Sequence, residues 1–149
     1  MSSALQLERY YFDDLVVCAG EADVPEEAEH NLKTESNLQR HKEDEHRWRL
    51  ELRIYTDEKD ENPPPKYGLG LRVIGFFRDS FDEMEQDQRA HLISVNGSSI
   101  LYSAAREFLL MVTNRCPHGG YWLPTVSFFK PLPDDQGTEE EAGDSDDGK

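Results

Sequence analysis

The clearest pattern along the chain is an alternation of apolar and charged side chains between residues 46 and 56. Arginine and glutamate occupy the odd positions from 47 to 53, and the apolar side chains at the even positions are Trp48, Leu50, Leu52 and Ile54. Successive side chains of a β-strand point to opposite faces of a sheet, so this period of two predicts a strand with one buried and one wet face. Residues 67–77 predict another strand, whose last part is apolar on both faces.

Two further strands are predicted from weaker patterns. Residues 4–17 are rich in Leu, Val, Tyr and Phe, and Arg9 and Asp13 interrupt their alternation, which favours a bulge. Residues 90–95 predict a short fourth strand, followed by turn and helix-cap chemistry at 96–99. Between the first two strands, residues 20–45 carry nine acids, three bases and few apolar side chains, so we expect a long, mobile acidic loop there.

A helix is predicted over residues 100–114, where apolar side chains recur at helical spacing in a broad stripe. Pro117 ends it, and Gly119 and Gly120 turn the chain into a strongly apolar extended arm, residues 121–129. Two prolines, Pro131 and Pro133, lead from this arm to an acidic tail. Four strands followed by a helix and an arm predict an α+β domain, in which a four-stranded antiparallel sheet has a long helix packed on one face.

This domain is predicted to have more apolar surface than one copy can bury. One helix covers one face of four strands, yet the end of strand 67–77, the helix and the arm are apolar on more than one side. A large uncovered apolar area marks an interaction surface. We therefore expect self-association, with some apolar surface left open to a partner.

Length and charge narrow the classes of function. The chain has 149 residues, which suits one domain, and a net charge of −15. Residues 134–149 hold eight acids and one lysine, a net −7, which leaves −8 for residues 1–133 and predicts an acidic body as well as an acidic tail. Nucleic-acid phosphates are bound by clustered Lys and Arg, so we expect no nucleic-acid ligand.

Targeting and cysteine usage favour a cytoplasmic protein. The sequence has neither a basic stretch followed by an apolar core at its start nor an apolar run of the roughly 18 residues that cross a bilayer. Its two cysteines, Cys18 and Cys116, are far apart and lack the spacing of a zinc site or a disulfide framework. We expect a protein that does not enter the membrane and lives in a reducing compartment.

Residues with catalytic or metal-binding potential are few. Cys116 lies two residues before His118, but a thiolate nucleophile needs a base and an electropositive pocket, and zinc needs three or four placed ligands. A glycine-rich phosphate loop is not recognisable, and a carboxylate-pair hydrolase is conceivable in any acidic chain without being indicated here. We expect neither an enzyme nor a bound cofactor or metal.

Three segments resemble the SecB family of protein-export chaperones. Residues 89–92 (RAHL), 100–107 (ILYSAARE) and 123–128 (LPTVSF) are similar to the last strand, the start of the long helix and the crossover segment of that family. Residues 7–17 and 75–77 are similar to parts of its first and third strands. The resemblance implies a SecB-like chaperone domain over residues 1–133, and from its acidic composition we expect residues 134–149 to be a disordered tail. It also implies a homotetramer, built as a dimer of dimers, whose apolar grooves hold unfolded polypeptides without ATP.

Departures from the SecB pattern bear on its partners. SecB has a second helix after the crossover segment, whereas residues 131–133 (PLP) and an acidic tail stand here, so we expect that C-terminal helix to be missing. Asp14 matches an acid through which SecB meets the SecA motor, but Gly70 and Arg72 stand where the third strand would supply another. Residues 96–102 and 108–113 look closer to SecB-like relatives that protect an antitoxin in toxin–antitoxin modules. Protein export and dedicated antitoxin protection are therefore both open.

The predicted client-binding residues come from the strand at 46–56, the helix and the arm. They are Trp48, Phe108, Met111, Tyr121, Trp122, Leu123, Val126 and Phe128. Each has a second interpretation as part of the core. The adjacent acids Asp13 and Asp14 are predicted to dock a partner, or else to be a solvated pair. One other class of function stays open, that of an interaction module, not a chaperone, which binds one folded protein through the arm 121–129.

Overall fold

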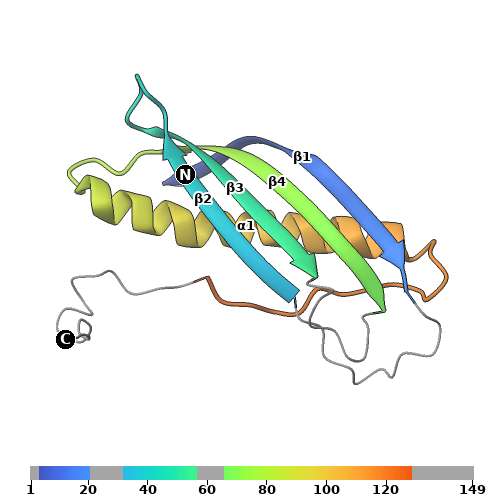
Figure 1. The fold of residues 1–149 in the computed structure, drawn as a ribbon. Helices are drawn as coiled ribbons and strands as arrows, with labels where there is room; N and C mark the ends of the chain where they lie inside the picture. The colour runs from blue at the N-terminus through green and yellow to red at the C-terminus, as the bar shows by residue number, and fades with distance from the viewer. Residues whose placement is uncertain (1–3, 21–31, 57–65, 129–149) are drawn as a thin grey trace, which may run out of the picture.

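The computed structural model describes residues 4–20, 32–56 and 66–128. These residues form four strands and one helix, in the order β1 (Leu5–Ala19), β2 (Leu32–Arg40), β3 (Arg47–Thr56), β4 (Tyr67–Asp79) and α1 (Gln86–Thr113). The strands make one antiparallel sheet in the order β1-β4-β3-β2, and α1 lies across one of its faces (Figure 1). The predicted α+β class, with a long helix on one face of a four-stranded antiparallel sheet, is confirmed.

The core lies between α1 and the two central strands, β3 and β4. Leu50, Leu52 and Ile54 of β3 are fully buried, as the alternation at 46–56 predicts. The buried face of β4 includes Val73 and Phe77. We call the sheet face toward α1 the inner face and the opposite face the outer face.

Strand β1 contains the predicted irregularity, in the form of two register shifts. They fall between Leu7 and Arg9 and between Phe12 and Asp14. Each shift adds one residue and moves the following side chains to the other face, so the inward positions change from odd to even and back to odd. The register places these β1 side chains opposite inward residues of β4: Leu5, Leu7, Tyr10, Phe12, Leu15 and Val17.

The predicted acidic loop at 20–45 is wrong for residues 32–40, which form strand β2. This strand lies at the edge of the sheet and pairs with β3 from Leu32 opposite Thr56 to Arg40 opposite Trp48. Seven of its nine residues are polar, because its outer side chains face the charged row of β3 and its inner side is only partly covered. The remainder of the predicted loop that precedes it, residues 21–31, lies outside the described residues.

The predicted fourth strand at 90–95 is also wrong, because α1 begins at Gln86 and runs through the whole stretch. Gly97 does not make a turn there but lets the helix approach the sheet. A Cβ atom at Gly97 would lie 2.8 Å from Leu50 Cδ2, and one at Gly75 of β4 would lie 2.8 Å from Leu101 Cδ2. The two glycines allow a close contact between helix and sheet.

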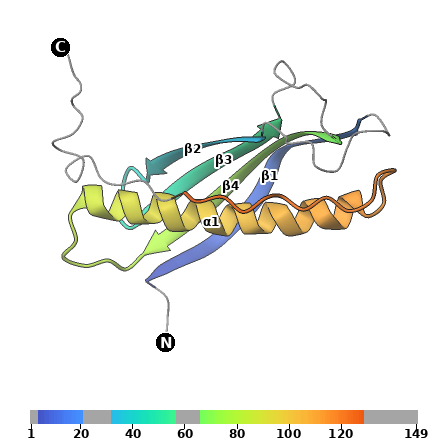
Figure 2. The same cartoon turned by 90° about the horizontal axis from the view of Figure 1, so that it is seen from below.

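After α1 the chain turns and runs back along the helix as an extended segment (Figure 2). Residues 121–128 contain no regular secondary structure. We call them the arm, which shortens the predicted arm by one residue because position 129 lies outside the described residues. The predicted absence of a second helix and the predicted disordered tail concern residues 129–149, which also lie outside the described part of the chain.

Candidate functional site

Helix α1 has two long sides that flank its buried face, and different segments lie against them. On one side Tyr102 contacts the arm, with its ring 5.5 Å from that of Phe128. On the other side Phe108 packs on Phe12 of β1, with 4.7 Å between ring centroids. We call these the arm side and the β1 side of α1.

Hydrogen bonds hold the beginning of the arm against the helix end. The backbone N–H of Tyr121 donates to Thr113 Oγ1 over 2.8 Å, and Thr113 Oγ1 donates to the carbonyl of Leu109 over 2.6 Å. Further along the arm, the hydroxyl of Tyr102 donates to the carbonyl of Pro124. Thr113 is fully buried, so these bonds are protected from water and fix the path of the arm.

The turn before the arm is held by Tyr67 at the start of β4. Its hydroxyl donates to the carbonyl of Gly119 over 2.7 Å and accepts from the backbone N–H of His118 over 3.1 Å. Gly119 has φ +78°, which a residue with a Cβ adopts at a cost, so this glycine suits the turn. The turn and the arm therefore have defined positions although they lack secondary structure.

Side chains of the arm alternate between the core and solvent. Tyr121 and Leu123 are buried, whereas Trp122 between them is 66% exposed. Burial raises the pKa of Tyr121 to about 12, so this phenol stays neutral over the physiological range. Two buried neighbours thus hold the backbone while an indole ring is presented to water, which favours contact with a partner over a role in the core.

Met111 and Val126 add to the exposed apolar surface, and both are among the predicted client-binding residues. Met111 on the last turns of α1 is 56% exposed, and Val126 on the arm is 36% exposed. Methionine adapts its shape to different apolar partners. Phe128, at the end of the described arm, is half-buried.

A groove of about 390 Å³ separates edge strand β2 from α1 and the end of the arm. It is lined by Thr34, Glu35 and Ser36 of β2, by His91, Ser94, Val95 and Ser98 of α1, and by Ser127 and Phe128 of the arm. The hydroxyl of Ser98 is buried and has no hydrogen-bond partner among the described residues. A polypeptide in this groove would meet the ring of Phe128 and strand β2, which no other described strand pairs with on that side.

The predicted site residues do not all come together. Tyr121, Trp122, Leu123, Val126 and Phe128 share the arm, but only Trp122 and Val126 among them are exposed. The predicted residue Phe108 lies on the other side of the helix, where it is half-buried against Phe12. Trp48, at the far end of the sheet, is 4% exposed.

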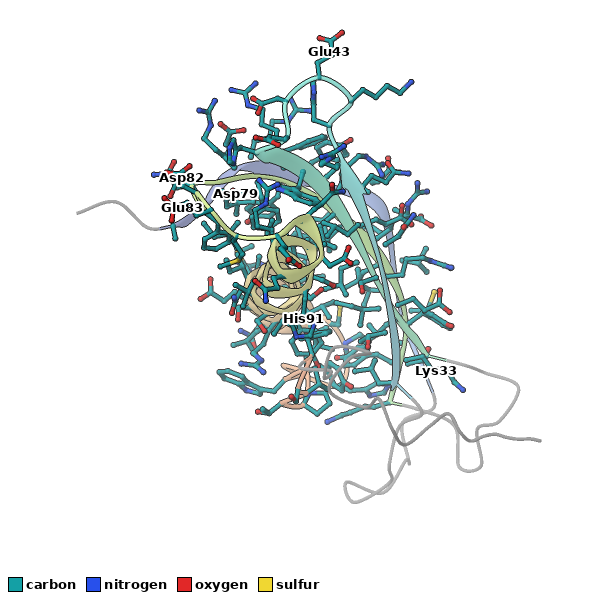
Figure 3. The ribbon with its side chains drawn as sticks, turned by 90° about the vertical axis from the view of Figure 1, so that its left-hand side faces the viewer. Lys33, Glu43, Asp79, Asp82, Glu83 and His91 are labelled. Atoms are coloured by element: carbon teal, nitrogen blue, oxygen red, sulfur yellow. The ribbon has the colours of Figure 1, made fainter. Side chains whose placement is uncertain are left out.

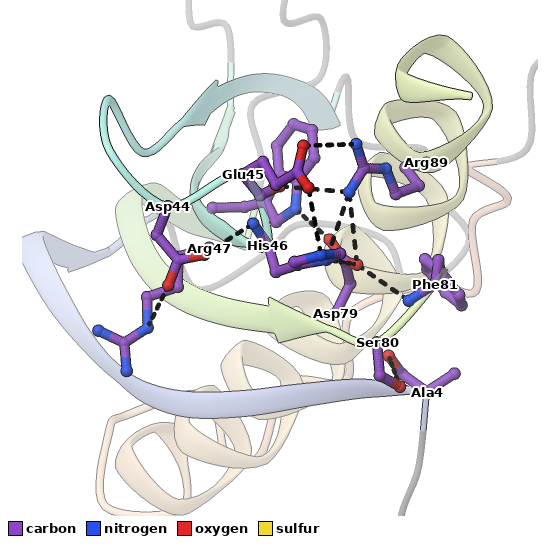
Figure 4. Close-up of polar contacts among 10 residues, drawn as sticks. Ala4, Asp44, Glu45, His46, Arg47, Asp79, Ser80, Phe81 and Arg89 are labelled. Atoms are coloured by element: carbon purple, nitrogen blue, oxygen red, sulfur yellow. Dashed lines mark hydrogen bonds and ion pairs between the residues drawn. The ribbon is translucent and has the colours of Figure 1, made fainter. Parts of the chain in front are cut away.

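Trp48 belongs to a buried polar cluster that the sequence pattern did not indicate. Its indole N–H donates to Asp79 Oδ2 over 2.6 Å, and the Asp79 side chain is fully buried at the end of β4. His46 Nδ1 shares a 2.8 Å hydrogen bond with Asp79 Oδ1 (Figure 4). The nearly buried Arg89 of α1 lies 3.9 Å from the same carboxylate and 3.7 Å from that of Glu45.

This cluster joins the β2–β3 hairpin, the end of β4 and the start of α1. The hydrogen bond with Asp79 raises the pKa of His46, because the carboxylate favours the protonated ring. Asp79 also accepts from the backbone N–H of Phe81 over 3.0 Å, which shapes the turn into the helix. The only sequence signal for the cluster is a pair of charged residues, Asp79 and Arg89, next to apolar runs, and such residues are usually exposed.

Asp13 and Asp14, the predicted partner-docking acids, are exposed on β1. Asp13 pairs with Arg72 of β4 over 3.2 Å, and Arg72 also lies 3.2 Å from Glu51. Register and alternation place six arginines on the outer face, and Figure 3 shows charged side chains along that side of the sheet. They are Arg9, Arg47, Arg49, Arg53, Arg72 and Arg78. The two acids therefore lie in an arginine-rich region, and their docking role stays a prediction.

Acidity is unevenly distributed over the chain, which corrects the expectation of an acidic body. The described residues carry 13 Lys and Arg against 14 Asp and Glu, a net charge of −1. The remaining −14 of the total of −15 belongs to residues 1–3, 21–31, 57–65 and 129–149. The described residues are thus nearly neutral, and the excess of acids belongs to the rest of the sequence.

Among the described residues, no group of three or more His, Cys, Asp or Glu side chains is placed to hold a metal ion. In the same part of the chain, no helix combines the length and the apolar character that are needed to span a bilayer.

No protein-family model matches this sequence, and no curated protein matches it. Its fold is similar to a solved structure, that of the Mycobacterium tuberculosis Rv1957 SecB-like chaperone in complex with a ChAD peptide from the Rv1956 HigA1 antitoxin. The TM-score is 0.61 with 13% sequence identity, over 87% of this chain and 94% of that chain. At this identity the likeness is one of fold, and it confirms the SecB-like fold that the sequence predicts.

Proposed function

We propose that this protein is a chaperone that binds non-native polypeptide segments without ATP. The observation that carries the proposal is Trp122, which is 66% exposed between the buried Tyr121 and Leu123. A folded domain rarely leaves its largest apolar side chain in water at a position with a defined backbone. The exposed ring fits a surface whose partner is another polypeptide.

Capture by this surface is passive. Unfolded chains expose apolar side chains, and contact with Trp122, Val126 and Met111 removes them from water, at about 25 cal/mol per Å² of apolar area. Such contacts are largely non-directional, and methionine repacks around different side chains, so many sequences fit. Weak single contacts add together when several binding surfaces of one oligomer hold the same client.

The groove beside β2 offers a second element of recognition. β2 lies at the edge of the sheet, and an extended client segment can pair with its free backbone groups. The half-buried Phe128 lines the same groove. Backbone pairing is independent of sequence, so it suits a protein that accepts varied clients.

Two classes of client follow from the SecB-like fold, and an antitoxin is the one that we favour. The similar Mycobacterium tuberculosis chaperone was solved with a peptide from an antitoxin. Precursors for protein export are the second class, with the SecA motor as the partner that Asp13 and Asp14 would dock. The outer face carries six arginines around these acids, which is unfavourable for a docking site that works through negative charge.

Self-association is part of the proposal, and the β1 side supports it. Tyr10 and Leu15 of β1 are 43% and 45% exposed although they point to the same face as the core residues. β1 is also the second edge of the sheet. A second copy that packs on this side would cover apolar area that one helix leaves open, as expected of a cytoplasmic homotetramer built from dimers.

An aggregation assay tests the function. Light scattering would follow three unrelated denatured proteins, with the chaperone at stoichiometric amounts and with no nucleotide present. We expect the wild-type protein to suppress aggregation of all three, and we expect Trp122→Ala to lose at least half of that effect with an unchanged melting temperature. Thr125→Ala is the matched control, because Thr125 is an exposed arm residue with little apolar area.

Two outcomes would contradict the proposal. If the wild-type protein suppresses no aggregation but binds one folded protein through the arm, the alternative function of an interaction module is correct. If Trp122→Ala unfolds the domain, the exposed ring belongs to the core and the assignment of the binding surface fails. Protection of a single antitoxin, with no effect on other clients, would restrict the function to a dedicated chaperone.

A further inference from the structure

A pocket of about 790 Å³ lies at the hairpin end of the sheet, away from the arm. Its floor includes one row of outer-face side chains that the register aligns across all four strands: Arg9, Phe76, Arg49 and Gln39. The hairpin residues 41–43 between β2 and β3 form one wall, and Figure 3 shows Glu43 at the tip of this hairpin. The pocket is therefore built from every strand of the sheet.

Cations dominate the lining of this pocket. The lining contains two acidic residues, Glu8 and Glu43, and five cationic ones. The cations are Arg9, Arg40, Lys42, Arg47 and Arg49. Positive charge is thus concentrated in a protein whose net charge is −15.

Three of these cations have no carboxylate partner in the described part of the chain. Arg40 lies opposite the inward Trp48 and donates to the neutral amide oxygen of Gln86 of α1 over 3.1 Å, so its guanidinium lies toward the inner face. The guanidinium of Arg9 lies over two aromatic rings, 5.3 Å from that of Tyr11 and 5.1 Å from that of Phe76. Lys42 makes no ion pair with any described residue. By contrast, Arg47 pairs with Glu8 over 3.7 Å.

We propose that this pocket binds the acidic residues 134–149 of the same chain. That segment carries eight acids and one lysine, and an acidic peptide is the ligand that a group of uncompensated cations recognises. Arginine forks bind carboxylates with two parallel hydrogen bonds, and Arg9 is already oriented by the two rings beneath it. The described residues have a net charge of −1, so together they do not repel the acidic segment.

The segment is long enough to reach the pocket. Phe128, the last described residue, lines a groove together with Ser36 of β2, and the pocket begins on the same strand at Gln39 and Arg40. At about 3.3 Å per residue, Arg40 is roughly 13 Å along the strand from Ser36. Residues 129–133 span up to roughly 17 Å when extended, before the acidic segment begins.

A tethered ligand has an advantage over a free one. The linker keeps the acids at an effective concentration in the millimolar range, and no encounter between two negatively charged molecules is needed. Residues 134–149 then compete with any acidic polypeptide for the outer face. The row of Arg9, Phe76, Arg49 and Gln39 lies on the outer face of the sheet, whereas the arm lies against α1 on the other side, so this self-binding does not depend on the proposed chaperone function.

Zero-length cross-linking of the full-length chain with a carbodiimide tests the proposal, because the reagent joins a lysine amine only to a carboxylate in contact with it. Lys42 lines the pocket. Lys66 is the control, because it comes just before β4 begins, at the end of that strand that lies away from the pocket. Peptide mass spectrometry would measure the yield of each cross-link to residues 134–147. We expect at least ten times more product at Lys42 than at Lys66, and a loss of most of it in 0.5 M salt.

Two variants and a labelling control sharpen the test. Arg9→Gln with Arg49→Gln should lower the Lys42 yield at least five-fold, whereas Trp122→Ala should leave it unchanged. A mixture of ¹⁵N-labelled and unlabelled protein distinguishes the same chain from a second copy, since mixed-isotope products would identify the second copy and overturn the proposal. Equal yields at Lys42 and Lys66, or a yield unaffected by the arginine substitutions in a variant with a normal melting temperature, would overturn it as well.

Discussion

The two long sides of helix α1 differ in what covers them. On the arm side, the chain returns after the helix and is fixed by hydrogen bonds at Thr113 and Tyr102. On the β1 side, the contact rests on apolar packing such as Phe12 against Phe108, and Tyr10 and Leu15 remain more than 40% exposed. Hydrogen bonds fix the arm in one position, so the arm side exposes a few defined side chains. The β1 side rests on apolar packing, and apolar side chains of the edge strand remain exposed there.

This difference has a topological cause. The order β1-β4-β3-β2 puts β1 at an edge, while glycines bring α1 closest to β3 and β4. Gly97 faces Leu50 of β3, and Gly75 of β4 faces Leu101 of the helix. The helix is therefore centred over the middle strands, and β1 extends beyond the area that it covers. Under the proposed function, the arm side would hold a client through a few residues, and the β1 side would join a second copy.

The largest effect is expected from removing a buried anchor of the arm. Leu123 is 3% exposed, so Leu123→Ala should lower the free energy of unfolding by about 2–5 kcal/mol through lost burial and a cavity. Its neighbour Trp122 supplies the control, since Trp122→Ala should change the stability by no more than about 0.5 kcal/mol. Urea denaturation measures both. Equal losses would mean that the arm does not alternate between core and solvent.

A smaller loss is expected from Thr113→Val, which keeps the shape of the side chain but removes its hydroxyl. The buried N–H of Tyr121 would lose its acceptor, at a cost of about 1–3 kcal/mol. We expect faster amide hydrogen exchange at Tyr121 and over the arm, with β1 unchanged. Thr125→Val, at an exposed arm position, is the control. Unchanged exchange at the arm would show that packing alone holds it.

On the β1 side, we expect a change in assembly rather than in stability. Tyr10→Lys combined with Leu15→Lys adds charge where both side chains are exposed, so each should alter the stability of one copy by only about 0.5 kcal/mol. Multi-angle light scattering should show a lower mass than that of the wild-type protein. Lys substitutions at Thr125 and Ser103, two exposed positions away from β1, should leave the mass unchanged. A wild-type protein that is already monomeric would refute this interpretation of the β1 side.

The smallest expected effect is a pH dependence of the stability, which arises in the polar cluster at the start of α1. The pKa of His46 is raised by its hydrogen bond with Asp79, with Glu45 adding to the rise and the nearby Arg89 opposing it. Protonated His46 therefore stabilises the fold at pH values below its unfolded pKa of about 6.5, and this contribution is lost as the pH rises through the folded pKa. His46→Gln should remove that part of the pH dependence. Denaturation curves of both proteins on either side of neutrality measure the difference, and parallel curves would contradict it.

Local patterns were sufficient for part of the fold and misleading for another part. The alternation at 46–56 and the apolar run at 67–77 correctly predict β3 and β4, because both strands bury one face against α1. β2 was missed because an edge strand buries little and keeps polar side chains, and 90–95 was predicted as a strand because Gly97 resembles a turn signal. In both errors the deciding contact is with a residue far away in the sequence.

The α+β class, the two central strands, the bulged first strand and the apolar character of the arm could all be predicted from the amino-acid sequence. Those properties depend on periodicity and composition within one segment. Only the tertiary structure decided which apolar residues are presented: Trp122 points outward while Trp48 is buried against Asp79. It likewise gathered cations from β1, β2, β3 and the β2–β3 hairpin around one pocket. Exposure and charge clustering depend on which segments meet across the sheet, and no local pattern contains that information.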